Sequence, residues 1–127
     1  MLKKQVKGLA HFGLPTNKFD ETLVFYEKLG FKNVFQTVNG NNRVAFLELN
    51  NVQVETYEEE LVAGKPGAID HIALAVENIE ETFQIIQNAD FNLLDKTINF
   101  LPFWENGTNF FTIEGPNGEK IEFCKKK

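Results

Sequence analysis

The chain has 127 residues, of which 43% are hydrophobic and 13 are phenylalanine, so it is long enough for one domain with a substantial apolar core. Its net charge of −5 and its scattered basic residues argue against nucleic acid as a partner, and the three terminal lysines are read as a solvated tail. A single cysteine excludes an internal disulfide, and no apolar run approaches a signal peptide or a membrane span, so we expect a cytoplasmic protein with one domain, residues 1–127, and no membrane partner.

The first half of the sequence predicts a strand, a helix and three further strands. GLAHFGLPT is the first strand candidate, and Asn17 with Asp20 three positions later is typical of a helix N-cap. The helix ends at Gly30 and carries one apolar stripe, formed by Phe19, Leu23, Tyr26 and Leu29. Strands follow in KNVFQTV, NRVAFLEL and VQVETYE, separated by Asn and Gly turn residues.

The stretch EEELVAGKPGA, acidic and then rich in Gly and Pro, predicts an exposed linker between two modules at about 5–60 and 68–126. In the second module, Asn78 and Glu81 indicate a helix N-cap, and the helix stripe consists of Ile79, Phe83 and Ile86. Three strands are then expected in FNLLDKTI, TNFFTIEG and EKIEFCK, with PNG turning the last pair. Each half is therefore about βαβββ.

The two modules are copies of one another. When the chain is shifted by 60 residues, five of the 24 ungapped pairs from Gly8/Ala68 to Phe31/Phe91 are identical. A half-length repeat of this kind is an architectural signal. The identical pairs are His11 with His71, Leu14 with Leu74, Glu21 with Glu81, Thr22 with Thr82 and Phe31 with Phe91.

The second module is longer than the first. A glutamate follows an apolar residue in the last strand of each half, and these two glutamates, Glu55 and Glu122, are 67 residues apart instead of 60. We place the extra residues, about seven, around NFLPFWENG. An aromatic-rich insertion in an otherwise symmetric fold is a candidate for a loop that contacts substrate.

The two histidines of the chain, His11 and His71, occupy the same point of the two modules. Either one alone is more often a hydrogen-bonded structural residue, and Glu55 or Glu122 alone is typical of the solvent face of a strand. Their joint placement changes this interpretation, because the first and last strands of each module both supply a possible ligand. Two imidazoles and two carboxylates suit Zn²⁺, Ni²⁺, Mn²⁺, Co²⁺ or Fe²⁺ and leave coordination positions open.

AHFGLPTNKFDETLVFYEKLGF, DHIALAVENIEETFQIIQNADF and EGPNGEKIEF together resemble the vicinal oxygen chelate superfamily, and within it glyoxalase I (lactoylglutathione lyase) and related small proteins. The resemblance covers nearly the whole chain. It implies an α+β fold in which paired βαβββ modules form an open barrel around a divalent metal. The ligands it implies are His11, Glu55, His71 and Glu122, with zinc or nickel as the first choice of metal.

The resemblance also implies a reaction, the isomerisation of the thiol adduct of a 2-oxoaldehyde such as methylglyoxal. The metal would hold two neighbouring substrate oxygens and stabilise the enediolate that forms when a C–H proton leaves. One glutamate would serve as general base. The resemblance favours Glu122, with Glu55 as the other candidate.

The sequence departs from glyoxalase I where that family grips glutathione with arginines. The position four residues beyond the first histidine is Pro15, and Arg43 is the one arginine of the chain and the one candidate for a guanidinium contact with substrate. Another thiol or another chelating substrate therefore remains open. Phe100, Phe103 and Trp104 are either an apolar wall over the substrate or simple packing of the insertion.

Other functions of the same fold stay as alternatives. A coenzyme A thioester epimerase usually has glutamine at the position of Glu55, and a fosfomycin resistance enzyme uses three protein ligands. A ring-cleaving dioxygenase needs a different ligand set and usually a longer chain. A non-catalytic protein that binds an antibiotic or another small molecule fits poorly, since unpaired buried carboxylates are costly.

The expected assembly is a homodimer with sites between its subunits. The chain is small, two-fold dimers are common, and the resemblance points to shared sites. His11 and Glu55 of one chain would then share a metal with His71 and Glu122 of the other.

Overall fold

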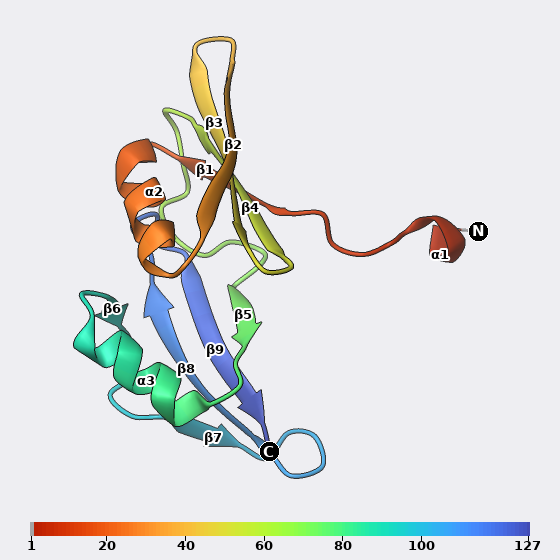
Figure 1. The fold of residues 1–127 in the computed structure, drawn as a ribbon, viewed down its shortest axis with the longest axis vertical. Helices are drawn as coiled ribbons and strands as arrows, with labels where there is room; N and C mark the ends of the chain where they lie inside the picture. The colour runs from red at the N-terminus through yellow and green to blue at the C-terminus, as the bar shows by residue number, and fades with distance from the viewer. Residues whose placement is uncertain (1) are drawn as a thin grey trace. The chain divides into compact units, whose positions relative to one another are not determined.

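The computed structural model describes residues 2–127. They form two compact units, one that ends at Val62 and one that spans Ala63–Lys127. Each unit contains a mixed sheet and one ten-residue helix that packs on it (Figure 1). The predicted α+β class with two βαβββ-type modules is confirmed, whereas the metal-centred barrel stays a prediction. None of the helices in residues 2–127 is long and apolar enough to cross a membrane.

In the first unit, the last strand lies beside the first. The sheet has the order β1-β4-β3-β2, with β1 parallel to β4 and the other neighbours antiparallel. This order follows from the crossover through the helix, which returns the chain to the far edge of the sheet before two hairpins bring it back. The elements are α1 (Leu2–Gln5), β1 (Phe12–Thr16), α2 (Phe19–Lys28), β2 (Lys32–Asn39), β3 (Asn42–Leu49) and β4 (Val52–Glu58).

The second unit repeats this order as β5-β9-β8-β6, again with the first strand parallel to the last. An additional short strand, β7, also pairs with β8. The elements are β5 (His71–Ala75), α3 (Ile79–Asn88), β6 (Asn92–Leu93), β7 (Asn99–Leu101), β8 (Thr108–Glu114) and β9 (Lys120–Lys126).

Each sheet buries the face that carries its helix. In the first unit, the buried side chains of α2 pack with Ala45, Leu47 and Val54, which are at most 2% exposed. In the second, Phe111 is fully buried, and its ring lies 5.0 Å from the rings of both Phe83 and Phe123. The predicted helix stripes are therefore the core faces of α2 and α3. The opposite face of each sheet is not covered by the helix of its unit.

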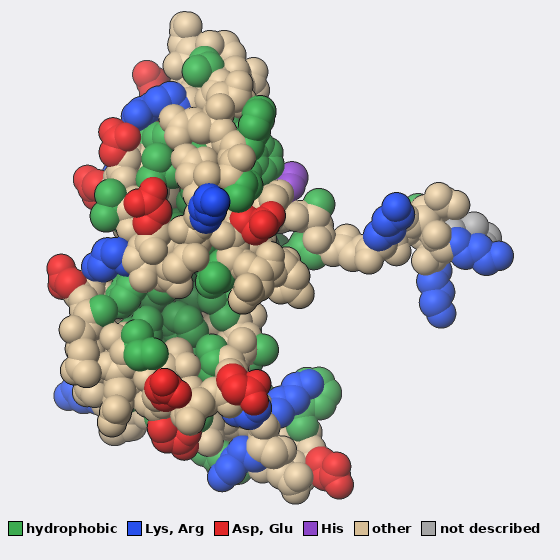
Figure 2. All heavy atoms as spheres, in the orientation of Figure 1, with side chains coloured by type: hydrophobic (Ala, Val, Ile, Leu, Met, Phe, Trp, Pro, Cys, Tyr) green, Lys and Arg blue, Asp and Glu red, His purple; other side chains and the backbone are tan. Residues whose placement is uncertain are grey.

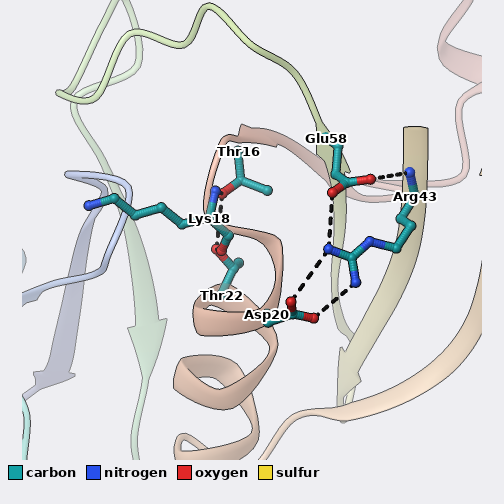
Figure 3. Close-up of polar contacts among 6 residues, drawn as sticks. All are labelled: Thr16, Lys18, Asp20, Thr22, Arg43 and Glu58. Atoms are coloured by element: carbon teal, nitrogen blue, oxygen red, sulfur yellow. Dashed lines mark hydrogen bonds and ion pairs between the residues drawn. The ribbon is translucent and has the colours of Figure 1, made fainter. Parts of the chain in front are cut away.

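The prediction of Asn17 as a helix N-cap is wrong, because α2 begins at Phe19 and its N-cap residue, Lys18, has no side-chain cap. Threonine hydroxyls organise this turn instead: Lys18 N–H donates to Thr16 Oγ1 at 2.8 Å, and Thr22 Oγ1 donates to the Lys18 carbonyl at 2.7 Å (Figure 3). Asn78 caps α3 as predicted, since its side chain accepts from the N–H of Glu81 at 2.9 Å.

The prediction of one strand through FNLLDKTI is also wrong. Only Asn92–Leu93 pairs there, and the chain leaves the ladder before β7 resumes it at Asn99. The Asp95 carboxylate accepts the Thr112 N–H of β8 at 2.7 Å and so replaces the backbone carbonyl that a continuous strand would have supplied. The expected insertion contributes β7 and the exposed turn that follows it.

The N-terminal segment of the first unit extends away from its sheet and ends in α1 (Figure 1). Basic side chains gather on this segment in the space-filling view, whereas acidic and basic side chains are interspersed over the rest of that face (Figure 2). The exposed lysines of the segment are Lys3, Lys4 and Lys7.

Candidate metal centre

The first unit brings His11 and Glu55 together. Glu55 lies on β4 opposite Gly13 of β1, and His11 stands two residues before Gly13, so both side chains project from the face that lacks the helix. His11 Nε2 lies 3.2 Å from Glu55 Oε1. Phe46, opposite Glu55 on β3, meets the imidazole edge-on with ring centroids 5.6 Å apart. The aromatic ring supports the histidine from the side.

The second unit brings His71 and Glu122 together in the same way. Glu122 lies on β9 opposite Ala73 of β5, two residues after His71, and His71 Nε2 lies 3.7 Å from Glu122 Oε1. Both glutamates are only partly exposed, at 28% for Glu55 and 21% for Glu122. The two pairs therefore have one register in common: the histidine lies two residues before the small residue that pairs with the glutamate.

Small residues at this register position make the pairing possible. Gly13 and Ala73 present at most a methyl group between the histidine and the glutamate, so the imidazole can reach across to the neighbouring strand. At Gly13 an added Cβ would meet only Tyr57, at 3.8 Å. This position therefore requires a small side chain but does not require glycine.

The donors fit a divalent metal in type and in spacing. Two ligands bound to one zinc ion at about 2.0–2.2 Å lie roughly 3.0–3.5 Å apart when the angle between them is tetrahedral or octahedral. The two nitrogen–oxygen separations, 3.2 and 3.7 Å, lie close to that range. Each unit supplies one pair, and residues 2–127 contain no group of three or more His, Cys, Asp or Glu side chains that could hold a metal.

Within residues 2–127, His71 has a second carboxylate partner and His11 does not. Its Nδ1 atom lies 3.0 Å from Asp70 Oδ2, and Lys120 Nζ lies 3.8 Å from Asp70 Oδ1. The hydrogen bond with His71, and then the positive charge of Lys120, lower the pKa of Asp70. Sequence reasoning missed this contact, although the signal was visible: Asp70 precedes His71 where Ala10 precedes His11.

Arg43 lies on the helix face of its sheet, away from Glu55. Its guanidinium bonds Glu58 and Asp20, each at 3.0 Å (Figure 3). It also lies over the Phe19 ring, 4.4 Å from the ring centroid. Hydrogen bonds to Glu58 and Asp20 raise the pKa of Arg43, and the bond from Arg43 lowers the pKa of Glu58. These contacts clamp β3 and β4 to the start of α2. A substrate contact of Arg43 stays a prediction.

The aromatic insertion is exposed. Phe100, Phe103 and Trp104 are 53%, 54% and 70% exposed, and Trp104 has a left-handed backbone with φ +64°. The Lys126 ammonium lies 3.7 Å above the Trp104 ring. Such strained residues are found at functional sites, so the predicted role of these aromatics in binding substrate stays in place as a prediction.

Cys124 lies on the same face of β9 as Glu122, two residues further along. It lines a concavity of about 420 Å³ together with Ala75 and Lys126 at the carboxyl ends of β5 and β9. Burial and the charge of Glu122 raise the pKa of the Cys124 thiol. A raised pKa lowers the share of the reactive thiolate at neutral pH.

Residues 8–123 match the model of the Glyoxalase/Bleomycin resistance protein/Dioxygenase superfamily. The chain belongs to this superfamily. It is also 30% identical over 129 residues to the uncharacterized protein YwbC of Bacillus subtilis (strain 168), an alignment that covers 94% of this chain and 98% of that protein. The superfamily includes metal-dependent enzymes.

Solved structures share the fold at low identity. A glyoxalase family protein from Enterococcus faecalis aligns with a TM-score of 0.79 and 21% identity, over 94% of this chain and 98% of that one. The fosfomycin resistance protein FosX from Listeria monocytogenes, complexed with Mn(II) and sulfate, aligns with a TM-score of 0.72 and 11% identity, over 96% and 94%.

Proposed function

We propose that the protein is a metal-dependent lyase or isomerase of the glyoxalase I type that acts, in the cytosol, on the thiol adduct of a 2-oxoaldehyde such as methylglyoxal. One observation carries the proposal: two units with the same topology each pair a histidine with a glutamate at the same register, at nitrogen–oxygen separations of 3.2 and 3.7 Å. A single pair of this kind would fit an ordinary structural contact, and its repetition at the same register in both units favours a shared role as metal ligands.

His11, Glu55, His71 and Glu122 are the proposed ligands of one divalent ion. Two imidazoles and two carboxylates favour zinc or nickel, with manganese, cobalt and iron also compatible. The manganese in the FosX structure is consistent with an ion of this class in this fold. When bound, the metal would polarise two neighbouring oxygens of the substrate and stabilise the negative charge that develops there.

Glu122 is the proposed general base, which takes the C–H proton next to the carbonyl and returns it to the neighbouring carbon. Its contact with histidine is the looser of the two, 3.7 Å against 3.2 Å, so less interaction opposes its movement. Glu55, the other candidate, has the shorter contact and is better suited to remain a ligand.

The substrate is proposed to rest against Phe100, Phe103 and Trp104. Because Pro15 stands where glyoxalase I has an arginine, and Arg43 already binds two carboxylates, glutathione adducts should be poor substrates. Turnover of the glutathione adduct with a kcat/KM near the diffusional ceiling, roughly 10⁸ M⁻¹s⁻¹, would contradict this. The comparison uses methylglyoxal with several small thiols.

Metal analysis of the purified protein tests the site itself. The parent should retain one divalent ion per site, and His71→Ala should lose it while keeping the circular dichroism spectrum. Glu48→Gln is the matched control, because Glu48 is an exposed glutamate of the first sheet that accepts a hydrogen bond from Gln53. Its replacement should leave the metal in place. A His71→Ala protein that holds metal as well as the parent does would refute the assignment. Metal retention without lyase turnover would favour the epimerase or a non-catalytic binding protein.

The proposed assembly is a homodimer in which His11 and Glu55 of one chain and His71 and Glu122 of the other complete each site. His11→Ala and Glu122→Ala, each inactive alone, are unfolded together and refolded as mixed dimers. Shared sites predict that one of the two sites in each mixed dimer regains all four ligands, so that activity returns. Mixed dimers that are confirmed by mass and remain inactive would exclude sharing.

A further inference from the structure

The two histidines differ in what surrounds them. His11 Nε2 is within hydrogen-bond distance of Glu55, at 3.2 Å, while His71 Nε2 is 3.7 Å from Glu122 and beyond it. His71 instead makes its short contact through the other nitrogen, Nδ1, to Asp70 at 3.0 Å. The same pair is thus built with different contacts at the two ring nitrogens of its histidine.

A neutral imidazole carries one proton, so one ring nitrogen donates and the other accepts. An ionised carboxylate only accepts, and the nearer carboxylate decides which nitrogen keeps the proton. For His71 that carboxylate is Asp70, so Nδ1 holds the hydrogen and the Nε2 lone pair faces Glu122. For His11 the contacting carboxylate is Glu55, at the Nε2 side, so no carboxylate holds the hydrogen on Nδ1.

We propose that Asp70, held by Lys120, is a positioning residue that fixes His71 as the Nδ1–H tautomer and thereby makes the second unit the pre-set half of the metal site. The effect of Asp70 on metal binding rests on the proposed function, whereas the tautomer of His71 does not depend on it. A histidine ligand that donates its other N–H to a carboxylate is better oriented and more basic, and loss of such a partner typically lowers metal affinity about 10- to 100-fold.

Lys120 explains why Asp70 can serve this role although it is 63% exposed. Lys120 is the register partner of His71 on β9, and its ammonium lies 3.8 Å from the Asp70 oxygen that does not contact the imidazole. The carboxylate is therefore held between a cation and the ring. The first unit has Ala10 at the corresponding position, so His11 has no neighbouring carboxylate of this kind to fix its tautomer.

The test measures the tautomers directly in metal-free protein, by long-range ¹H–¹⁵N correlation of the two imidazoles at a pH where both are neutral. We expect His71 mainly as Nδ1–H, with a larger Nδ1–H population than His11, which has no carboxylate at Nδ1. Asp70→Ala should move His71 toward the Nε2–H form, and Asp70→Asn, which keeps an acceptor oxygen, should restore most of the Nδ1–H population. His71 found as Nε2–H in the parent, or unchanged in Asp70→Ala, would overturn the proposal.

Zinc affinity, measured by competition with a chromophoric chelator, tests the consequence. Asp70→Ala should bind zinc about 10- to 100-fold more weakly than the parent. Glu77→Ala, which removes an exposed carboxylate of the same unit, should bind like the parent. Equal affinities for the parent and Asp70→Ala would refute the positioning role. If the tautomers are as expected but the parent binds no zinc, the tautomer assignment stands. The metal-centred function and the role of Asp70 in metal binding would then both be refuted.

Discussion

Replacing Asp95 with alanine should destabilise the second sheet, because the Asp95 carboxylate takes the place of a backbone carbonyl in the ladder. Its Oδ2 atom accepts the N–H of Thr112 at 2.7 Å at the point where the chain leaves the ladder between β6 and β7. Thr112 is the ladder partner of Glu122. The hydrogen bond therefore supports the strand pair that carries the proposed base.

The size of the effect follows from what is left behind. The Asp95–Thr112 bond is short and charge-assisted, a class worth about 1.5–3 kcal/mol, and its loss leaves a half-buried N–H without its acceptor. The adjacent bond from Leu94 N–H to the Thr112 carbonyl, at 2.9 Å, stays in place. We therefore expect a loss of about 2 kcal/mol in the free energy of unfolding, or roughly 6–10 °C in Tm for a chain of this size.

Urea unfolding followed by circular dichroism gives the free energy, and hydrogen exchange of the Thr112 amide locates the effect. Asp95→Asn is the matched control, since its amide oxygen still accepts, and it should lose less than half as much stability. Asp95→Ala should also raise exchange at Thr112 more than at the core amides of β9. A change in unfolding free energy below about 0.5 kcal/mol would show that water replaces the carboxylate and that the reasoning is wrong.

Three further predictions concern pH, reactivity and backbone strain. Because Arg43 lowers the pKa of Glu58, the stability that this carboxylate contributes is fully present above its ordinary pKa and is lost as the pH falls through the lowered value. Glu58→Gln should therefore be less stable than the parent at neutral pH. The difference between their urea midpoints should disappear in acid. Because burial raises the pKa of Cys124, its alkylation in the folded protein should be slower than in urea, and equal rates would contradict its burial. Gly118→Ala should cost clearly more stability than Gly40→Ala, since both have positive φ but only the Gly118 methyl would meet a backbone carbonyl; equal losses on thermal unfolding would contradict this.

The repeat made most of the topology predictable. Two copies of one pattern, each with a helix between its first and second strands, leave few ways to form a mixed sheet, and the right-handed crossover selects among them. The strands at 32–39, 42–49 and 52–58 appear where alternation and turn residues place them. The end of α2 at Gly30 was also predictable from the sequence. Gly30 has φ +105°, and the N–H of Phe31 donates to the carbonyl of Tyr26 at 2.9 Å.

Side-chain substitutes for backbone groups were not predictable. Asn17 has the right residue type for an N-cap, but Thr16, one residue earlier at the end of β1, accepts the Lys18 N–H and shifts the helix start to Phe19. In the same way, nothing in the letters FNLLDKTI shows that Asp95 will accept a ladder N–H. In both places a short polar side chain competes with the backbone, and only the tertiary arrangement decides which bond forms.

The two histidine–glutamate pairs of the candidate site were predictable from the sequence, but the contact of Asp70 with His71 was not. The placement of each histidine at the start of the first strand, and of each glutamate on the strand beside it, follows from the repeat, because the first strand pairs with the last in both units. Asp70 went unnoticed because a residue adjacent in sequence normally points to the other face of a strand. It precedes β5, however, and there its carboxylate can turn back to the imidazole.

The chemistry of both units depends on a single register. In each parallel pair, the glutamate lies opposite the residue two positions after the histidine, and alternation puts both side chains on the face without the helix. A slip of one residue in β9 would turn Glu122 into the core and bring Ile121 out beside His71, so it would cost both a ligand and a buried apolar side chain. The buried residues that flank the glutamates, Val54 and Thr56 in one unit and Ile121 and Phe123 in the other, therefore fix the site as firmly as any polar contact. Core packing on one face of each sheet sets the geometry of the donors on the other.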